Sequence, residues 1–177
     1  MAVRPVLKMG HPLLRQVAAA VDVFDVAQMQ ELLIDMEDTM RALHGAGIAA
    51  PQIGVSQRVV IFEMLENPRY PHVAPIPFTV LVNPVLEPLG TDMEEGWEGC
   101  LSVPGLRGVV PRYRRLHYSG LDAQGQFFER TVEGFHARVV QHEVDHLDGV
   151  LFPQRVQDMT RFGFEDALVG QMVPTPD

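Results

Sequence analysis

The chain has 177 residues, 46% hydrophobic and 21% charged, a balance typical of a folded protein and unlike that of a disordered or fibrous chain. The net charge of −9 argues against direct binding to nucleic acid. We expect one domain over residues 1–177, because this length suffices for a sizeable core but is short for two domains. No apolar run approaches the roughly 20 residues of a membrane span. The single cysteine excludes an internal disulfide and fits a cytoplasmic location.

Residues 25–44 are predicted to form the first long helix. Asp25 can cap its start, and Gly45 can end it as a left-handed residue. Apolar side chains recur at three- and four-residue spacing, which predicts one stripe that packs in the core: Val26, Met29, Leu33, Met36, Met40 and Leu43.

Four apolar, β-branched runs predict strands, at residues 58–64, 79–83, 116–121 and 127–132. The last two flank residues 122–125, which read as a hairpin loop. The proline-rich residues 67–77 are predicted to form a surface loop.

The hydrophobic period changes toward that of a helix over residues 133–148, and Gly149 is expected to end this helix. Residues 160–171 are expected to form a short last helix. Strands and helices are segregated rather than alternating, so we expect the α+β class with largely antiparallel strands.

The strongest chemical signal is the HExxH motif within QHEVDHLDG, residues 141–149. His142 and His146 are four residues apart, so a helix would place both imidazoles on one face, where they can share a metal ion. Glu143 follows the first histidine and can act as a general base on a water molecule at the metal. The motif therefore predicts a metal-dependent hydrolase.

A catalytic site of this kind needs a third protein ligand. Extending the motif to HExxHxxGxxH would require a histidine where the chain has Phe152. Glu165 downstream and Cys100 upstream are both candidates. Cys100 lies in WEGCLSVPG, where Gly99 allows close approach of the backbone and the Leu101 N–H can point into the site.

A third segment is GAGIAAPQIG, residues 45–54, directly after the first predicted helix. Its small residues permit close approach of the backbone, and Gln52 supplies an amide donor beside them. On its own this segment most often forms a turn, and it carries no phosphate-binding lysine.

Together the three segments resemble the peptide deformylase family, whose pattern is a glycine-rich segment ending in Gln, then EGCLS, then HExxH. The chain shows GAGIAAPQ at 45–52, EGCLS at 98–102 and HEVDH at 142–146, in that order. The resemblance extends over about residues 1–155. It implies an α+β fold with largely antiparallel sheets packed around a central helix that bears HExxH.

The resemblance also implies the roles of the site residues. Cys100, His142 and His146 would hold a divalent metal ion, and Glu143 would be the catalytic carboxylate. Gln52 and the Leu101 N–H would bind the oxyanion. Five residues would lie beside the substrate, the last two as walls of a methionine pocket: Gly47, Ile48, Gly99, Phe135 and Val139.

Two further side chains match the family pattern less directly. Family members often pair the Glu of EGCLS with an Arg after Val-Pro, which here gives Glu98 and Arg112. Arg138 lies between the two pocket residues, and its spacing leaves open whether it faces the pocket or solvent. The only basic cluster is predicted to be a solvated surface patch: Arg107, Arg112, Arg114 and Arg115.

The implied reaction is removal of the N-formyl group from the initiator methionine of newly synthesised polypeptides. The implied partners are N-formylmethionyl nascent peptides. An enzyme that acts on nascent chains can contact the ribosome transiently, but the residues after Leu151 do not have the basic character of a ribosome-docking helix. Fe²⁺ is the implied cofactor, although one thiolate and two imidazoles also suit Zn²⁺, Ni²⁺ or Co²⁺.

Three other functions fit parts of the pattern. A zinc peptidase would use His142, His146 and Glu165 as ligands. A cysteine hydrolase would use Cys100 as the nucleophile, so a chelator would leave its activity intact. A structural zinc module would need a fourth protein ligand, for which the single cysteine leaves few candidates.

Overall fold

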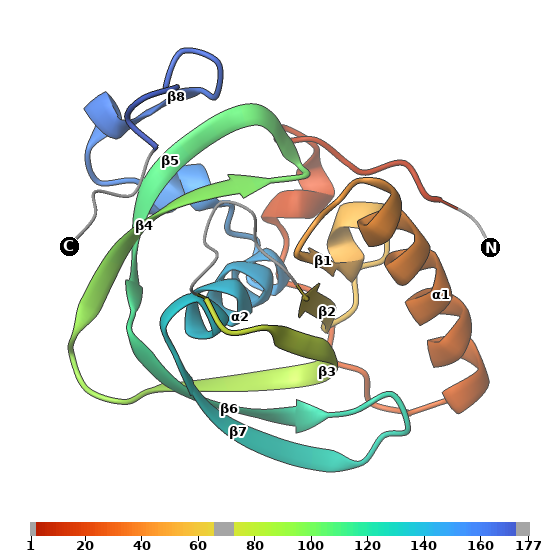
Figure 1. Ribbon diagram of the computed structural model, residues 1–177. Helices are drawn as coiled ribbons and strands as arrows, with labels where there is room; N and C mark the ends of the chain where they lie inside the picture. Colours follow the sequence, from red (N-terminus) through yellow and green to blue (C-terminus); the bar gives the residue numbers. More distant parts are fainter. Residues whose placement is uncertain (1–2, 66–72, 173–177) are drawn as a thin grey trace.

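The computed structural model describes residues 3–65 and 73–172. Two helices and eight strands are assigned within these residues (Figure 1). In chain order they are α1 (Val26–Ala42), β1 (Gly47–Ala49), β2 (Val59–Met64), β3 (Ile76–Pro88), β4 (Met93–Cys100), β5 (Val103–Tyr113), β6 (Arg115–Leu121), β7 (Phe127–Glu133), α2 (Gly134–Leu147) and β8 (Phe162–Phe164). Short 3-10 turns lie between them: η1 (Pro12–Arg15), η2 (Ala50–Ile53), η3 (Phe152–Arg155) and η4 (Met159–Arg161).

The strands form two antiparallel sheets. The larger has the order β1-β2-β3-β6-β7, and the smaller has the order β4-β5-β8. β3 joins the two parts of the larger sheet, because its first half pairs with β2 and its second half pairs with β6. The predicted α+β class with largely antiparallel strands is therefore confirmed.

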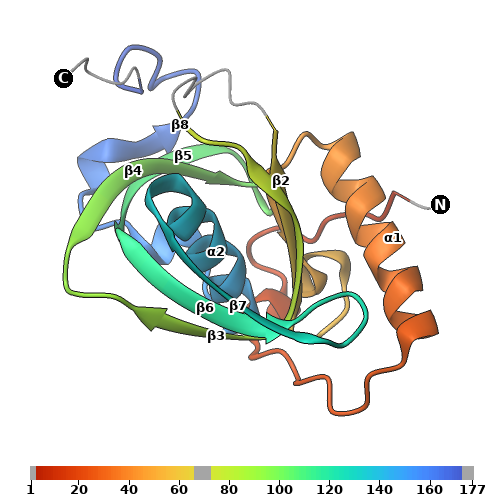
Figure 2. The ribbon, with the colours of Figure 1, turned by 60° about the horizontal axis from the view of Figure 1, so that its bottom comes forward.

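The two helices cover opposite faces of the larger sheet. Side chains alternate along β2: Val60 and Phe62 pack in the core cluster that contains α2, whereas Val59 and Ile61 pack in the cluster that contains α1. Figure 2 shows α2 enclosed between the two sheets, with α1 on the outside. This arrangement places the HExxH residues in the interior, on a helix held from both sides.

The start of α1 matches the prediction, but its end does not. Asp25 accepts hydrogen bonds from the N–H groups of the first turn, and the middle of the predicted stripe is buried. At the far end His44 adopts the left-handed conformation, with φ of 55°, in place of Gly45. Gly45 is closely surrounded, because a Cβ there would lie 3.0 Å from Leu101 Cδ1 and 3.3 Å from the Gly47 carbonyl oxygen. The exposed ends of the stripe are Val26 and Leu43, each 44% exposed.

All four predicted strands and the 122–125 hairpin loop are confirmed. Gly149 ends α2 as expected, with φ of 72°. Residues 67–72 of the proline-rich segment lie outside the described residues, and Ile76 and Pro77 belong to β3 rather than to a loop.

The predicted last helix over 160–171 is wrong. Phe162, Gly163 and Phe164 instead form β8 and pair with β5. Pairing with β5, more than 50 residues earlier in the chain, outweighs the local helical pattern, and Phe162 also packs edge to face on Phe152. Neither helix in the described part of the chain is long and apolar enough to cross a membrane.

Candidate metal centre and active site

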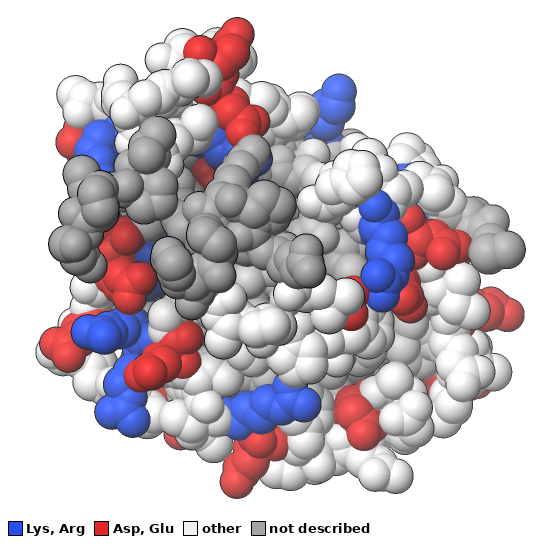
Figure 3. Space-filling view, viewed as in Figure 1, with Lys and Arg blue, Asp and Glu red and all other residues white. Residues whose placement is uncertain are grey.

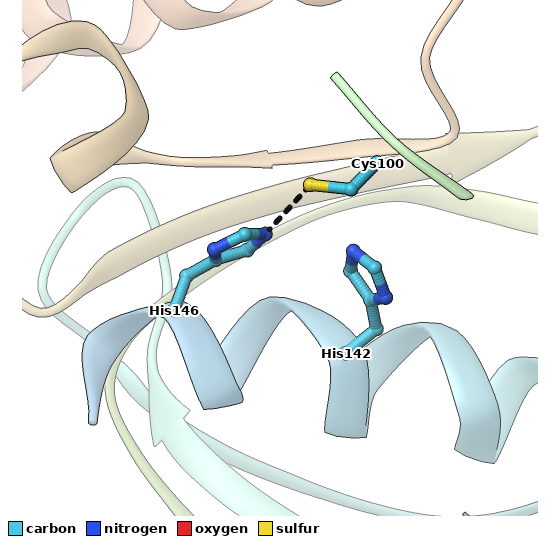
Figure 4. A group of neighbouring side chains, drawn as sticks. All are labelled: Cys100, His142 and His146. Atoms are coloured by element: carbon cyan, nitrogen blue, oxygen red, sulfur yellow. Dashed lines mark hydrogen bonds between the residues drawn. The ribbon is translucent and has the colours of Figure 1, made fainter. Parts of the chain in front are cut away.

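The two histidines of the HExxH motif lie on the last two turns of α2. Because they are four residues apart, their rings stand side by side, with centroids 5.2 Å apart. Figure 4 shows both rings directed away from the helix axis toward Cys100. The Cys100 Sγ atom lies 3.4 Å from His146 Nε2.

Cys100 is the last residue of β4 and precedes the turn that leads into β5. The ladder between these strands is interrupted between the pairs Glu98–Gly108 and Cys100–Val103. Such irregularities redirect a side chain out of its regular alternation. Gly99 sits in the interruption, and a Cβ there would lie only 1.9 Å from Arg107 Nη1. A side chain at residue 99 would therefore have to displace the Arg107 guanidinium.

The ligand atoms of Cys100, His142 and His146 all lie within 4.8 Å of one another. A sulfur and a nitrogen bound to one tetrahedral zinc-sized ion would be about 3.6 Å apart, close to the observed separation of Cys100 and His146. The donor set therefore fits a divalent metal ion with three protein ligands. Glu165 is not part of this group in the described residues, and it pairs with Arg107 at 3.5 Å.

Gln52 reaches the thiol from η2. Its Oε1 accepts a hydrogen bond from the Ala49 N–H at 2.8 Å, which fixes the amide orientation. Its Nε2 donates to Ser102 Oγ at 3.0 Å and lies 3.5 Å from Cys100 Sγ. The Ser102 N–H also donates to that sulfur, at 3.4 Å. Ser102 was not singled out from sequence, although it is part of the EGCLS motif.

Glu143 is buried beside the ligands. A Cβ on Gly47 would lie 2.5 Å from Glu143 Oε1, so the β1 backbone packs directly on this carboxylate. Glu143 Oε2 is buried without a hydrogen-bond partner in the described residues. Burial raises the pKa of Glu143 to about 7.

Glu98 orients the first histidine. Its Oε1 accepts a hydrogen bond from His142 Nδ1 at 2.7 Å, which leaves His142 Nε2 for a metal. Arg112 donates to both oxygens of Glu98 at 2.9 Å, as the resemblance suggested. Burial alone would raise the pKa of Glu98, but the bonds from His142 and Arg112 lower it, so Glu98 is ionised. Burial lowers the pKa of His146, which keeps its ring neutral.

The expected surface patch of four arginines does not form. Arg112 is only 5% exposed and also pairs with Asp145, whereas Arg114 and Arg115 are exposed. Arg138, whose direction the spacing left open, is 6% exposed and bonds to Glu98. Figure 3 shows acidic and basic side chains interspersed on the visible face.

A cleft of about 1070 Å³ opens beside the three candidate ligands, slightly above the range usual for ligand sites. Its walls include most of the residues expected beside a substrate: Gly47, Gln52, Gly99, Leu101, Phe135 and Val139. Ile48 differs, because its side chain is fully buried in the cluster beneath α1. Its backbone belongs to the edge strand β1.

Comparison with known proteins decides the family. The model of the polypeptide deformylase family matches residues 3–162. The chain belongs to this family. Its members are metal-dependent enzymes that remove the formyl group from the N-terminal methionine of nascent polypeptides.

Individual relatives agree with this assignment. The chain is 61% identical over 166 residues to peptide deformylase 1 of Nitrosomonas europaea, covering 94% of each protein. It is similar to a class I type b peptide deformylase from Acinetobacter baumannii solved with Met-Ala-Ser, with 42% identity, TM-score 0.84, and coverage of 88% of this chain and 99% of the other. A peptide deformylase from Thermotoga maritima gives 32% identity, TM-score 0.78, and coverage of 89% and 100%.

Proposed function

We propose that this chain hydrolyses the N-formyl group of N-formylmethionyl peptides at a metal ion held by Cys100, His142 and His146, with Glu143 moving the protons. The observation that carries the proposal is the convergence of one sulfur and two imidazoles beside a buried carboxylate. This donor set leaves room for solvent and substrate, as catalytic sites with three protein ligands do.

A divalent ion in this site would lower the pKa of water and polarise a carbonyl oxygen, so that hydrolysis proceeds at neutral pH. We propose Fe²⁺ as the resident ion, in line with the family resemblance. Zn²⁺, Co²⁺ and Ni²⁺ also suit one thiolate and two imidazoles.

Glu143 is proposed to take a proton from the attacking water and to deliver it to the methionine nitrogen as the C–N bond breaks. Water adds to the formyl carbon, and the products are formate and the free amino terminus. The burial of Glu143 next to His142, with its Oε2 atom free of any hydrogen-bond partner in the described residues, supports this role.

The formyl oxygen gains negative charge when water adds to the carbon. We propose that Gln52 Nε2 and the Leu101 N–H donate hydrogen bonds to it. The position of Gln52 Nε2, 3.5 Å from the sulfur of Cys100, supports this role, because it puts an amide donor at the edge of the site. Removing one such donor typically costs about 10²–10³ in rate.

The substrate backbone is proposed to run between Gly47 and Gly99, beside the edge strand β1, with Phe135 and Val139 as walls for the methionine side chain. The cleft lining supports this placement. The Acinetobacter relative was solved with Met-Ala-Ser, and we extend to this chain the binding of at least three residues. Because the substrate is a product of protein synthesis, we place the enzyme in the cytoplasm, in transient contact with ribosomes.

The proposal is tested by metal content and formate release from a formyl-Met-Ala-Ser peptide. We expect Glu143→Gln to keep its metal but lose about 10²–10⁴ in rate. Cys100→Ser should lose metal, and Glu165→Gln should keep it. Metal loss only in Glu165→Gln would instead support the zinc peptidase.

The size of the acyl group gives a second test. Because the β1 backbone packs against Glu143, we expect the site to accept a formyl group and to exclude larger ones. Acetyl-Met-Ala-Ser should therefore be cleaved far more slowly than the formyl peptide. Equal rates for the two peptides would contradict a site that selects the formyl group.

A further inference from the structure

Arg138 is a buried cation to which the proposed mechanism gives no role. It lies on α2, one turn before His142, and its side chain is enclosed between the helix and the smaller sheet. Nη1 donates to Glu98 Oε2 at 2.8 Å and to the Val110 carbonyl at 2.7 Å. Nη2 donates to the Glu94 carbonyl at 2.6 Å. Three short bonds therefore hold the guanidinium in one place.

These bonds connect the two elements that carry the metal ligands. Glu94 and Glu98 belong to β4, the strand that ends in Cys100, and Val110 belongs to the neighbouring β5. α2 supplies the two histidines. The Arg138 side chain therefore ties the strand of the sulfur ligand to the helix of the nitrogen ligands.

The backbone opposite Arg138 is shaped to admit it. A Cβ on Gly96 would lie 2.8 Å from Arg138 Cζ, Nε and Nη2. Gly96 has no left-handed φ to explain its identity. The absence of a side chain at residue 96 is therefore explained by the space that the guanidinium occupies.

Arg138 also completes the set of donors around Glu98. The carboxylate receives two bonds from Arg112, one from His142 Nδ1 and one from Arg138. Without Arg138, the Glu98 Oε2 atom keeps only one of its two observed hydrogen bonds, the one from Arg112 Nε. Glu98 would then be held less tightly, and so would the ring of His142.

We infer that Arg138 is a positioning residue that sets the placement of Cys100 relative to His142 and His146 and thereby strengthens metal binding. The inference rests on the proposed metal site. Partners that orient ligands in this way typically contribute 10–100-fold to metal affinity. A planar guanidinium with several donors suits the task, because it can bond a carboxylate and two carbonyls at once.

The experiment is a Co²⁺ titration of metal-free protein in competition with a coloured chelator. The wild-type protein is compared with Arg138→Met and with Arg138→Lys. Methionine has a similar side-chain volume to arginine but no hydrogen-bond donors. Gly96→Ala displaces the guanidinium without removing it. Arg155→Met is the matched control, because it loses two bonds to Asp145 in the same ion cluster but none to Glu98. Urea unfolding of each metal-free protein checks that the variant is folded and measures its stability.

We expect Arg138→Met to bind Co²⁺ 10–100-fold more weakly, with a shifted cobalt–thiolate absorption band, and Arg138→Lys and Gly96→Ala to lie between it and wild type. Arg155→Met should be destabilised yet stay within about threefold of wild type. If Arg138→Met does not fold, a Gly96→Ala or Arg138→Lys protein that folds and binds as wild type overturns the inference.

Two results separate this inference from the proposed function. If the wild-type protein binds no Co²⁺, or if Cys100→Ser binds Co²⁺ as tightly as the wild type does, both the proposed metal site and the role of Arg138 are wrong. Tight binding by wild type that is lost in Cys100→Ser but unchanged in folded Arg138→Met overturns only the role of Arg138.

Discussion

Helix α2 is buried on two sides by different kinds of contact. Toward the larger sheet it presents an apolar stripe, Ala137, Val140, Val144 and Leu147. Toward β4 and β5 it presents a polar stripe, Arg138, Gln141, His142 and Asp145, whose members all bond to those strands or to side chains on them. The apolar stripe stabilises the helix through buried surface and packing, whereas the hydrogen bonds of the polar stripe set the direction of individual side chains. We therefore expect the two sides to fail in different ways when they are altered.

The largest effect is expected on the polar side. Glu98→Ala removes the carboxylate that Arg112, Arg138 and His142 share, and leaves buried cations without a partner. We expect a loss of about 3–5 kcal/mol in the free energy of unfolding, measured by urea denaturation, together with weaker metal binding. Glu95→Ala is the control, because Glu95 lies on the same strand and pairs with Arg161 in an exposed position. It should cost less than about 1 kcal/mol.

The apolar side should respond with stability alone. Val140 is fully buried against the larger sheet, so Val140→Ala should lower the free energy of unfolding by about 2 kcal/mol through lost burial and the cavity that remains. Metal affinity should stay within about threefold of wild type. Val85→Ala, at an exposed site on β3, is the control and should cost less than about 0.5 kcal/mol. A large fall in metal affinity for Val140→Ala would show that the two sides are not separable.

Gly47→Ala sharpens the comparison at the edge of the site. The new Cβ would overlap the Glu143 carboxylate, so the side chain must move. We expect formate release to fall roughly tenfold or more, since about 1.4 kcal/mol of barrier gives a factor of ten. Gly163→Ala is the control, because a Cβ there makes only ordinary contacts near 3.8 Å with Leu168. If Gly47→Ala keeps full activity, the Glu143 carboxylate does not lie against residue 47 in the active enzyme.

The smallest effect concerns pH. His136 packs against Phe62 and Tyr118, and burial together with the charge of Arg130 lowers its pKa to about 4. The unfolded chain, with a histidine pKa near 6.5, binds more protons between these values. The titration of His136 therefore costs no stability above pH 6.5, and it lowers the free energy of unfolding as the pH decreases toward 4.

His136→Phe removes this titration while keeping an aromatic ring at the site. The difference in unfolding free energy between wild type and variant should change by roughly 1 kcal/mol from pH 7 to pH 4.5, after allowance for partial exposure of the ring. Parallel pH curves for the two proteins would contradict the lowered pKa.

The same contrast explains what the sequence could predict. Both long helices, four of the five strands of the larger sheet, the hairpin loop and the Gly149 stop follow from apolar periodicity and turn residues. The exception is β1, which lies in the glycine-rich segment that local sequence predicts as a turn. Arg138, Gln141 and Asp145 are polar or charged, so apolar periodicity alone does not place them in the interior. They are buried because β4 and β5 cover them, and those strands are too rich in glycine and charge to show regular alternation.

The candidate site divides in a similar way. The HExxH spacing, the cysteine and Gln52 could be recognised from short motifs. Arg138 and Asp145 enter the site only through contacts that join distant segments, and Ile48 shows that a motif residue can be turned toward the core. The wrong helix at 160–171 has the same cause, because pairing of β8 with β5 is not visible in local sequence.

The most direct test of the proposed reaction is formate release from formyl-Met-Ala-Ser by protein that has been treated with a chelator and then supplied with Fe²⁺. We predict that activity is lost on chelation, returns with one Fe²⁺ per chain, and does not return in Cys100→Ser. Formate release that persists in fully metal-free protein would contradict a metal-dependent deformylation at this site.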